Sequence, residues 1–418
     1  MKLSVSHAWL FPLTICGFAA AGVSGLDAAF TTTTRWLGLL LLALFLLHRR
    51  RLLDGLRLSY APALVGWLIW NIATTFWSEQ PALSLVKSLA MALTVITVIS
   101  GGLYWVRSRP GSPLSYLAPL AGVALFAGLA GSGGFVWNNV GVRLYRGVST
   151  NANYLGVLAA VGLAYPLYAL HRSVARRERA VVLAFWLLVA VVLAALLWLS
   201  GSRAAALAAA PLVLAFAVAA TPRRIARRSA VCALFVVSAA LLSPAKVTTA
   251  VSRPIMSFAD KGRPDVFFSR RPVWTRSAQA AREGGVAGLG FGVNAGAPAN
   301  FQIGRMTTSG YTRLKANSQL ATIEETGLIG LAAYGIVLIQ LFSALFAGLQ
   351  RVDRDLRVAL SLVIGLLCGL VVHSIFEGWG TSPGSMETVL FWATAGVGGG
   401  LLRLPRLRDA NIRPAESS

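Results

Sequence analysis

Long apolar stretches recur along this chain of 418 residues, and most of the connections between them are short. Each stretch has about the length that an α-helix needs to cross the hydrocarbon core of a bilayer. The stretches are continuous in Leu, Ala and Val, whereas strands of a membrane β-barrel alternate apolar and polar residues. Only 13% of the residues are charged, about half the share in soluble domains. The sequence therefore predicts an all-α integral membrane protein.

The lengths of the apolar stretches predict about twelve transmembrane helices. Their approximate limits are 8–25, 31–48, 58–77, 83–106, 113–130, 155–171, 180–199, 204–220, 229–243, 318–347, 358–374 and 387–402. Residues 1–25 are alternatively a cleaved signal peptide. Lys2 is the only basic residue before that stretch, and Pro12 and Gly17 interrupt it, so we favour an uncleaved first span.

Arginine residues cluster in every second connection, which predicts how the spans are oriented. The clusters follow spans two, four, six, eight, ten and twelve: Arg49, Arg50, Arg51 and Arg57; Arg107 and Arg109; Arg172, Arg176, Arg177 and Arg179; Arg223, Arg224, Arg227 and Arg228; Arg351, Arg354 and Arg357; Arg403, Arg406, Arg408 and Arg413. Short cytoplasmic connections carry an excess of Lys and Arg. Both termini, including the tail 403–418, are therefore expected in the cytoplasm.

One long polar loop, 244–317, separates spans one to nine (1–243) from spans ten to twelve (318–402). With its margins it holds eleven Lys and Arg residues against three acidic residues. On the outer face this charge runs against the positive-inside bias, and an anionic ligand explains it most simply. Around 272–283 the loop has the pattern of a helix, with Pro272 at an early position. The net charge of +23 comes without a nucleic-acid-binding motif, so membrane lipids and a phosphorylated ligand are the expected partners, and nucleic acid is not.

Several arginines are placed to bind phosphate at the outer face. Ser202 and Arg203 lie at the outer mouth of span seven, where an arginine is costly unless it is paired or functional. A guanidinium can bind phosphate through two parallel hydrogen bonds, although Arg203 could also be a snorkelling side chain. In the long loop, Arg271, Trp274 and Arg276 would share roughly one side of the helix. The outer segment 131–154 adds Arg143 and Arg146.

Acidic residues and a histidine lie near the outer ends of spans ten and eleven. Asn317 or Ser318 could cap span ten, which leaves Glu324 and Glu325 near its outer boundary, where they could complement the helix dipole. His373 and Glu377 are one helical turn apart at the end of span eleven. Without a second cluster, a hydrogen-bonded pair is favoured over a metal site, and we expect no metal ion.

These motifs, in this order and topology, resemble the O-antigen ligase and polymerase superfamily, and O-antigen ligases most closely. The resemblance covers most of the chain. The family's Ser-Arg element resembles Ser202-Arg203, and its Asn-containing segment resembles 151–154, which includes Asn153. Its pattern of Arg, then Trp, then a glycine-rich stretch resembles Arg271, Trp274 and 288–292.

The most diagnostic family pattern is a histidine, then Asn, Ser or Gln, nine residues, and G-x-x-G. Asn317, Gly327 and Gly330 match it, but Ala316 stands at the position of the histidine, which is a functional residue in ligases of this family. Either this member works without that histidine, or the chain is an inactive variant. If the match is meaningful, restoring a histidine at 316 should raise activity.

The resemblance implies a periplasmic glycosyltransferase of the bacterial inner membrane. Such an enzyme transfers O-antigen polysaccharide from undecaprenyl diphosphate to the lipid A–core oligosaccharide during lipopolysaccharide biosynthesis. We expect inversion at the anomeric carbon, without metal or cofactor. Arg203, with Arg143, Arg271 and Arg276, would stabilise the leaving diphosphate.

The general base and the acceptor stay open at this point. Position 316 is where the family places its histidine, and Glu325, His373 and Glu377 are the other candidates for a base. A polymerase, or a ligase that transfers the glycan to protein, would use the same donor. A polysaccharide or lipid flippase is the non-enzymatic alternative, but no internal repeat is visible and the unusual charge gathers at one face.

Overall fold

The computed structural model describes residues 5–131, 134–137, 143–220, 271–295 and 315–412. Over these ranges the fold is helical apart from a short antiparallel hairpin, which pairs Phe135 with Tyr145. The elements are η1 (Val5–Trp9), α1 (Leu10–Ala20), α2 (Thr32–His48), η2 (Asp54–Arg57), α3 (Ala61–Ala73), η3 (Thr74–Trp77), α4 (Pro81–Ser108), η4 (Pro113–Leu117), α5 (Ala118–Leu129), β1 (Phe135–Trp137), β2 (Arg143–Tyr145), α6 (Ala152–Gly162), α7 (Ala164–Ala175), α8 (Ala180–Ser200), α9 (Arg203–Ala220), α12 (Arg271–Gly284), α13 (Ser318–Gly348), α14 (Arg354–Ser374) and α15 (Met386–Ile412).

The helices confirm the predicted all-α membrane fold. Six helical segments of the described chain are long and apolar enough to cross a bilayer: Pro81–Ser108, Ala152–Ala175, Ala180–Ser200, Arg203–Ala220, Ser318–Gly348 and Arg354–Ser374. Helices also occupy the predicted ranges 8–25, 31–48, 58–77, 113–130 and 387–402. The predicted span 229–243 lies outside the described residues, so the number twelve stays a prediction.

Apolar and polar side chains are distributed as expected for a protein surrounded by lipid. Helix α8 is the most apolar of the six long segments, yet only 22% of its apolar window is buried. Its exposed side chains include Val181, Phe185 and Leu188. By contrast, Asn71 and Ser100 are completely buried inside the bundle. Soluble proteins normally show the reverse pattern, so the exposed apolar surface is best explained by contact with acyl chains.

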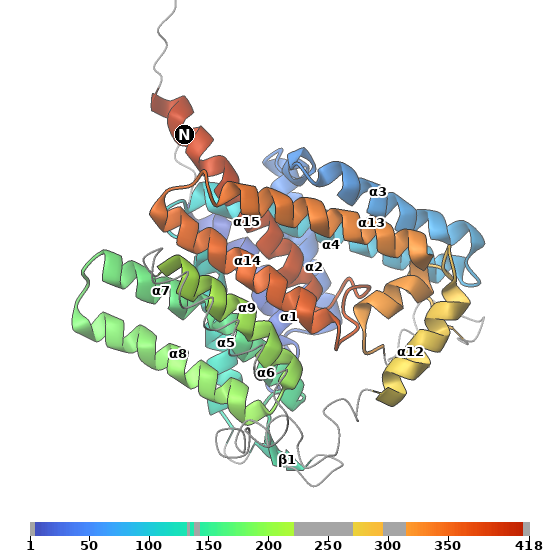
Figure 1. Ribbon diagram of the computed structural model, residues 1–418, viewed down its shortest axis with the longest axis horizontal. Coiled ribbons are helices and arrows are strands. Elements are labelled where there is room, and N and C mark those ends of the chain that lie inside the picture. Colours follow the sequence, from blue (N-terminus) through green and yellow to red (C-terminus); the bar gives the residue numbers. More distant parts are fainter. Residues whose placement is uncertain (1–4, 132–133, 138–142, 221–270, 296–314, 413–418) are drawn as a thin grey trace, which may run out of the picture.

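The bundle is held together by closely packed helix pairs (Figure 1). Helix α4 packs along α15, α9 along α14, and α3 along α13. Where α4 crosses α15, a Cβ atom on Gly102 would come within 2.7 Å of the carbonyl oxygen of Ala393. Membrane helices approach closely where such small residues meet, because apolar lipid leaves packing as the main attraction between them.

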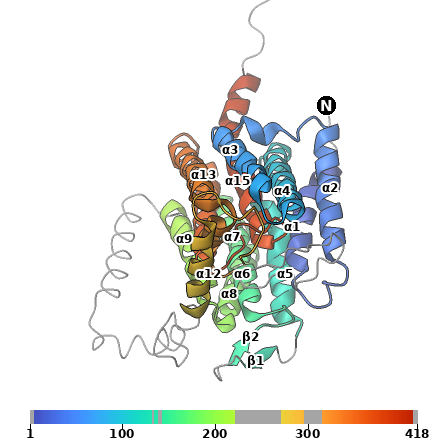
Figure 2. The same ribbon diagram turned by 90° about the vertical axis from the view of Figure 1, so that its right-hand side faces the viewer.

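Two of the predicted elements can be compared closely with the structure. The span expected at 155–171 lies in the helical segment Ala152–Ala175, in which α6 and α7 join at Leu163. Leu163 keeps helical backbone angles, and Pro166 leaves one gap in the hydrogen-bond ladder because it has no N–H to donate to the carbonyl group of Gly162. The helix expected at 272–283 is confirmed as α12, which lies beside the beginning of α13. The β1–β2 hairpin and the C-terminal part of α15 lie at opposite ends of the molecule in both views (Figures 1 and 2).

Candidate functional site

Helix α12 of the long loop is hydrogen-bonded to the residues that precede membrane helix α13. The indole Nε1 of Trp274 donates a hydrogen bond to the carbonyl oxygen of Ala316, 3.2 Å away. The indole ring also lies against Phe376, with the ring centroids 5.9 Å apart. Trp274 therefore joins three segments that are far apart in the sequence: α12, the residues before α13, and the connection after α14.

Helix α13 is broken near its beginning. Gly327 has φ 71° and ψ −175°, a conformation outside the helical region, so that a short first segment and a long second segment meet there. L-residues with a side chain rarely adopt this conformation, whereas glycine does so at little cost. Gly327, the first glycine of the G-x-x-G pattern, is thus the point at which this membrane helix is interrupted.

The glycine-rich end of the long loop satisfies the backbone groups that this break leaves unpaired. The N–H groups of Leu289 and Gly290 donate to the carbonyl oxygens of Glu324 and Glu325, at 2.9 and 3.0 Å. On the other side of the break, the N–H group of Leu328 donates to the carbonyl oxygen of Gly285 at 3.1 Å. Unpaired backbone groups are costly in an apolar environment. Residues 284–290 therefore replace the missing turn of α13.

Close packing explains why glycines are needed in this loop. Gly288 has φ 84°, and a Cβ atom there would collide with the backbone of Glu325. Gly290 and Gly292 also have positive φ, 113° and 78°, and a Cβ atom there would collide with the side chains of Ser78 and Lys87. These glycines therefore let the end of the long loop pack closely against α13, Ser78 and α4.

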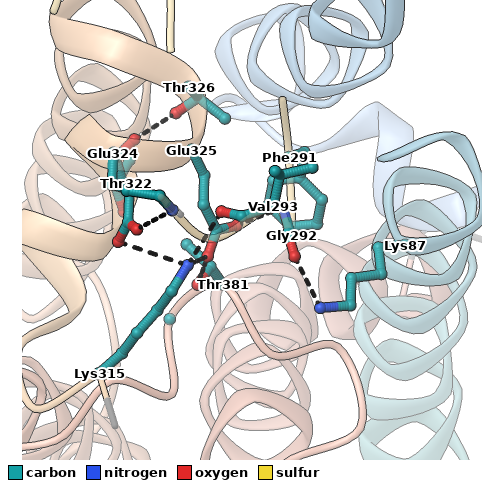
Figure 3. A network of polar contacts seen from close by, with 12 residues as sticks. Lys87, Phe291, Gly292, Val293, Lys315, Thr322, Glu324, Glu325, Thr326 and Thr381 are labelled. Carbon is teal, nitrogen blue, oxygen red and sulfur yellow. Dashed lines mark hydrogen bonds and ion pairs between the residues drawn. The ribbon is translucent and has the colours of Figure 1, made fainter. Parts of the chain in front are cut away.

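A buried cluster of charged side chains lies beside the break (Figure 3). The amino group of Lys315 contacts the carboxylate of Glu325 and lies 3.6 Å from that of Glu324. Glu325 also accepts hydrogen bonds from the Thr381 hydroxyl at 2.7 Å and from the N–H group of Gly292 at 2.5 Å. The side chains of Lys315, Glu324 and Glu325 are 7%, 1% and 2% exposed. Glu325 is thus held by several donors and shielded from solvent.

Lys87 adds a second buried ammonium group next to this cluster. It lies in α4, and its Nζ donates to the carbonyl oxygen of Gly292 at 2.9 Å. Lys87, Lys315 and Thr381 were not expected from the sequence as members of this site. The sequence did contain an indication of this role for Lys87, because a charged residue inside an apolar span is costly unless it has a partner. Two lysines and two glutamates balance in charge, as buried ionic groups require.

The first turn of α13 is tied to the connection between α14 and α15. Asn317 caps the helix as predicted, because its Oδ1 accepts from the N–H group of Leu320 at 2.8 Å. Its Nδ2 donates to the carbonyl oxygen of Ile375 at 2.9 Å. The Ser318 hydroxyl donates to the carbonyl oxygen of Glu377 at 2.8 Å. Asn317, which matches the family pattern, therefore links the start of α13 to the connection between α14 and α15.

An open pocket of about 620 Å³ lies where α12, the start of α13 and the end of α14 meet. Residues of α12, of the first turn of α13 and of the end of α14 line it: Trp274, Thr275, Ala278, Asn317, Gln319, Leu320 and Ile375. Its walls are mostly apolar with a few amide groups. Such concave surfaces are the usual sites for organic ligands, and two of the residues that carry the family resemblance, Trp274 and Asn317, contribute to it.

Helical geometry separates the arginines of α12. Successive residues of an α-helix are rotated by about 100°, so Arg271 lies on the side of Trp274, Thr275 and Ala278, which line the pocket. Arg276 is rotated from Arg271 by roughly 140°, so the three predicted residues do not share one side. All three arginines of α12 are exposed. Arg282, which was not among the predicted residues, lies on the pocket side one turn beyond Ala278.

The remaining predicted binding residues lie around α6, α8 and α9. Ser202 is buried and caps α9, with its hydroxyl 3.4 Å from the N–H group of Ala205. Arg203 begins α9 and is half-buried. In the 151–154 motif, Asn151 caps α6, whereas Asn153 is exposed.

Arg143 and Arg146 both belong to the segment that contains the hairpin. Arg143 is the first residue of β2, and the exposed Arg146 follows that strand. The N–H group of Arg146 donates to the carbonyl oxygen of Gly134 at 2.7 Å. The backbone of Arg146 is thus fixed at the hairpin, while its side chain faces outward.

The candidates for a general base differ in accessibility. His373 is 2% exposed and lies in the last turn of α14. Glu377 is half-buried, and its N–H group donates to the carbonyl oxygen of His373 at 3.1 Å, so the predicted one-turn spacing is present. Ala316 is completely buried. Among the described residues, no group of three or more His, Cys, Asp or Glu side chains could hold a metal ion.

Comparison with models of known protein families and with curated proteins finds no match for this chain. Among solved structures, a peptidoglycan synthase complex, from work on the structural coordination of polymerization and crosslinking, matches 82% of this chain and 96% of that chain. The sequence identity is 19% and the TM-score is 0.39. A likeness of this degree carries no functional argument.

Proposed function

We propose that this protein is a glycosyltransferase that takes its glycan from a lipid diphosphate at the outer surface of a bacterial inner membrane. More specifically, we propose an O-antigen ligase, which transfers O-antigen from undecaprenyl diphosphate to the lipid A–core oligosaccharide. One observation carries the proposal: Trp274 and Asn317, which the resemblance selects from separate segments, line one open pocket, and Trp274 donates a hydrogen bond to Ala316, the residue before Asn317. The exposed Arg271 and Arg282 lie on the side of α12 that lines that pocket.

The proposed topology has twelve spans and cytoplasmic termini, with the loop 244–317 in the periplasm. The basic connections support this orientation, and the lipid-facing surface of the helices supports insertion in a membrane. In this arrangement α12 stands where the diphosphate of a membrane-anchored donor is expected. The arginines would stabilise the charge that develops on the diphosphate when the glycosidic bond breaks.

The chain's own side chains suggest separate roles for the acidic residues. Glu325 is enclosed by Lys315, Thr381 and Gly292, so we assign it a positioning role at the break in α13. Glu377 is the more accessible carboxylate and lies next to Phe376, the ring partner of Trp274. We therefore favour Glu377 as the base that takes the proton from the acceptor hydroxyl.

Reconstitution tests the proposal directly. Purified protein in proteoliposomes is supplied with undecaprenyl diphosphate-linked glycan and with lipid A–core as acceptor, and the ligated product is detected on gels. Arg203→Ala is expected to abolish ligation without lowering the protein level, while Arg203→Lys keeps a charge but loses the planar fork.

The same assay separates the alternative functions. Chain extension without lipid A–core would indicate a polymerase, and transfer to a protein acceptor would indicate a protein ligase. Movement of the lipid-linked glycan between leaflets without any transfer would indicate a flippase.

A further inference from the structure

A second charged cluster lies far from the pocket in the sequence, around the buried side chain of Asp54 in η2. Arg107, at the end of α4, places Nη1 2.5 Å from Oδ2 of Asp54. Arg51 lies 3.4 Å from the same oxygen, and Nη1 of Arg57 lies 3.8 Å from Oδ1. The Asp54 side chain is only 5% exposed, so its carboxylate pairs with these guanidinium groups from the protein interior.

The cluster has more positive than negative charge. Arg403 of α15 joins it by donating from Nη2 to the carbonyl oxygen of Arg57 at 2.6 Å. Four guanidinium groups thus converge from the α2–α3 connection, α4 and α15. Within the described chain, Asp54 is the carboxylate with which three of them, Arg51, Arg57 and Arg107, form ion pairs. The side chains of Arg51 and Arg57 are 47% and 78% exposed, so the surplus charge faces outward.

An apolar face of α2 leads toward this cluster. Leu37, Leu40, Leu44 and Leu47 are spaced by three and four residues, which places them on one side of the helix. They are 53%, 44%, 60% and 58% exposed, and Leu53 beyond the helix is 59% exposed. The basic residues begin directly where this face ends, at Arg49.

We propose that this cluster is a binding site for the phosphate headgroup of an anionic phospholipid, whose acyl chains lie along the leucine face of α2. Guanidinium groups bind phosphate through charge-assisted hydrogen bonds, and basic pockets between membrane helices are suited to anionic headgroups. A free phosphate would use the arginines but not the leucine face, so the occupant is a lipid. The inference does not depend on the proposed glycosyl transfer.

Thermal unfolding of the full-length protein in detergent tests this site. We compare added phosphatidylglycerol, phosphatidylcholine and inorganic phosphate, and expect only phosphatidylglycerol to raise the midpoint. In Arg51→Gln/Arg57→Gln most of that rise is lost. The matched control, Arg176→Gln/Arg179→Gln, removes the same charge from exposed positions of the α7–α8 connection and keeps the full rise.

Three results would overturn the lipid site: equal loss in both double variants, no rise in the unmodified protein, or an equal rise with inorganic phosphate. The first would mean that the basic connections act only through their summed charge. If the double variant fails to fold, Arg57→Gln alone replaces it in the test. Of the three arginines that pair with Asp54, Arg57 is the most exposed and the farthest from the carboxylate.

Discussion

The indole nitrogen of Trp274 lies 3.2 Å from the carbonyl oxygen of Ala316 and donates a hydrogen bond to it. This contact links helix α12 to the residue that directly precedes Asn317, the cap of α13. The position of α12 relative to the membrane helices is therefore fixed partly by one side chain. Because α12 also carries the exposed arginines, any change in this link should alter their placement over the pocket.

Trp274→Phe removes the indole N–H group but keeps a ring against Phe376. We expect a loss of about 1 kcal/mol of stability and a clear fall in ligation in the reconstituted assay. Trp274→Leu also removes the aromatic contact, so it should lower ligation further. Equal, undiminished activity in both variants would show that the link does not matter for function.

The break in α13 offers a matched pair of glycine substitutions. Gly327→Ala forces a side chain into a positive φ and against the backbone of Val286, and should cost well over about 1 kcal/mol. Gly335→Ala lies in the same helix with open space around it, and should be neutral or stabilising by up to about 1 kcal/mol. Thermal unfolding midpoints measure both, and a similar cost for the two variants would contradict a structural role of the break.

The Lys315–Glu325 contact should show strong energetic coupling. Removing either charge by Lys315→Met or Glu325→Gln leaves an uncompensated buried charge, at a cost of about 3–5 kcal/mol. In the double variant, the cost should be well below the sum of the two single costs. A double-mutant cycle on the unfolding free energy measures the difference, and strict additivity would argue against a functioning ion pair.

Part of this architecture was predictable from the sequence, and part was not. The membrane helices follow from the length of the apolar runs, and α12 follows from Pro272 and the local pattern. The cap by Asn317 was also predictable, because it depends on neighbouring residues only. By contrast, the contact between Lys315 and Glu325 lies beside a break in α13, where a positive φ at Gly327 is accompanied by packing of residues 284–290 against the helix. No local pattern reports such a tertiary contact.

The face of α12 that lines the pocket distinguishes its arginines. We expect Arg271→Ala and Arg282→Ala to lower ligation by about tenfold or more, since each removes a charge-assisted contact of about 1.5–3 kcal/mol. Arg276→Ala is the control, because Arg276 lies on another side of the same helix and is also exposed to solvent. Initial rates at several donor concentrations measure the effect. A loss for Arg276→Ala as large as for Arg271→Ala would mean that the pocket is not where the diphosphate binds.

Ala316 gives the sharpest test of the family resemblance. Its side chain is completely buried, so Ala316→His must make room for an imidazole and should cost about 1–3 kcal/mol of stability through overpacking. If position 316 serves the reaction as the resemblance implies, the same variant should nevertheless raise ligation above that of the unmodified chain. Ala316→Gln adds similar bulk without a group that can accept a proton near neutral pH, so it should lose stability and gain no activity. Equal activity in the two variants would show that the match at this residue is misleading, and Glu377 would remain as the candidate base.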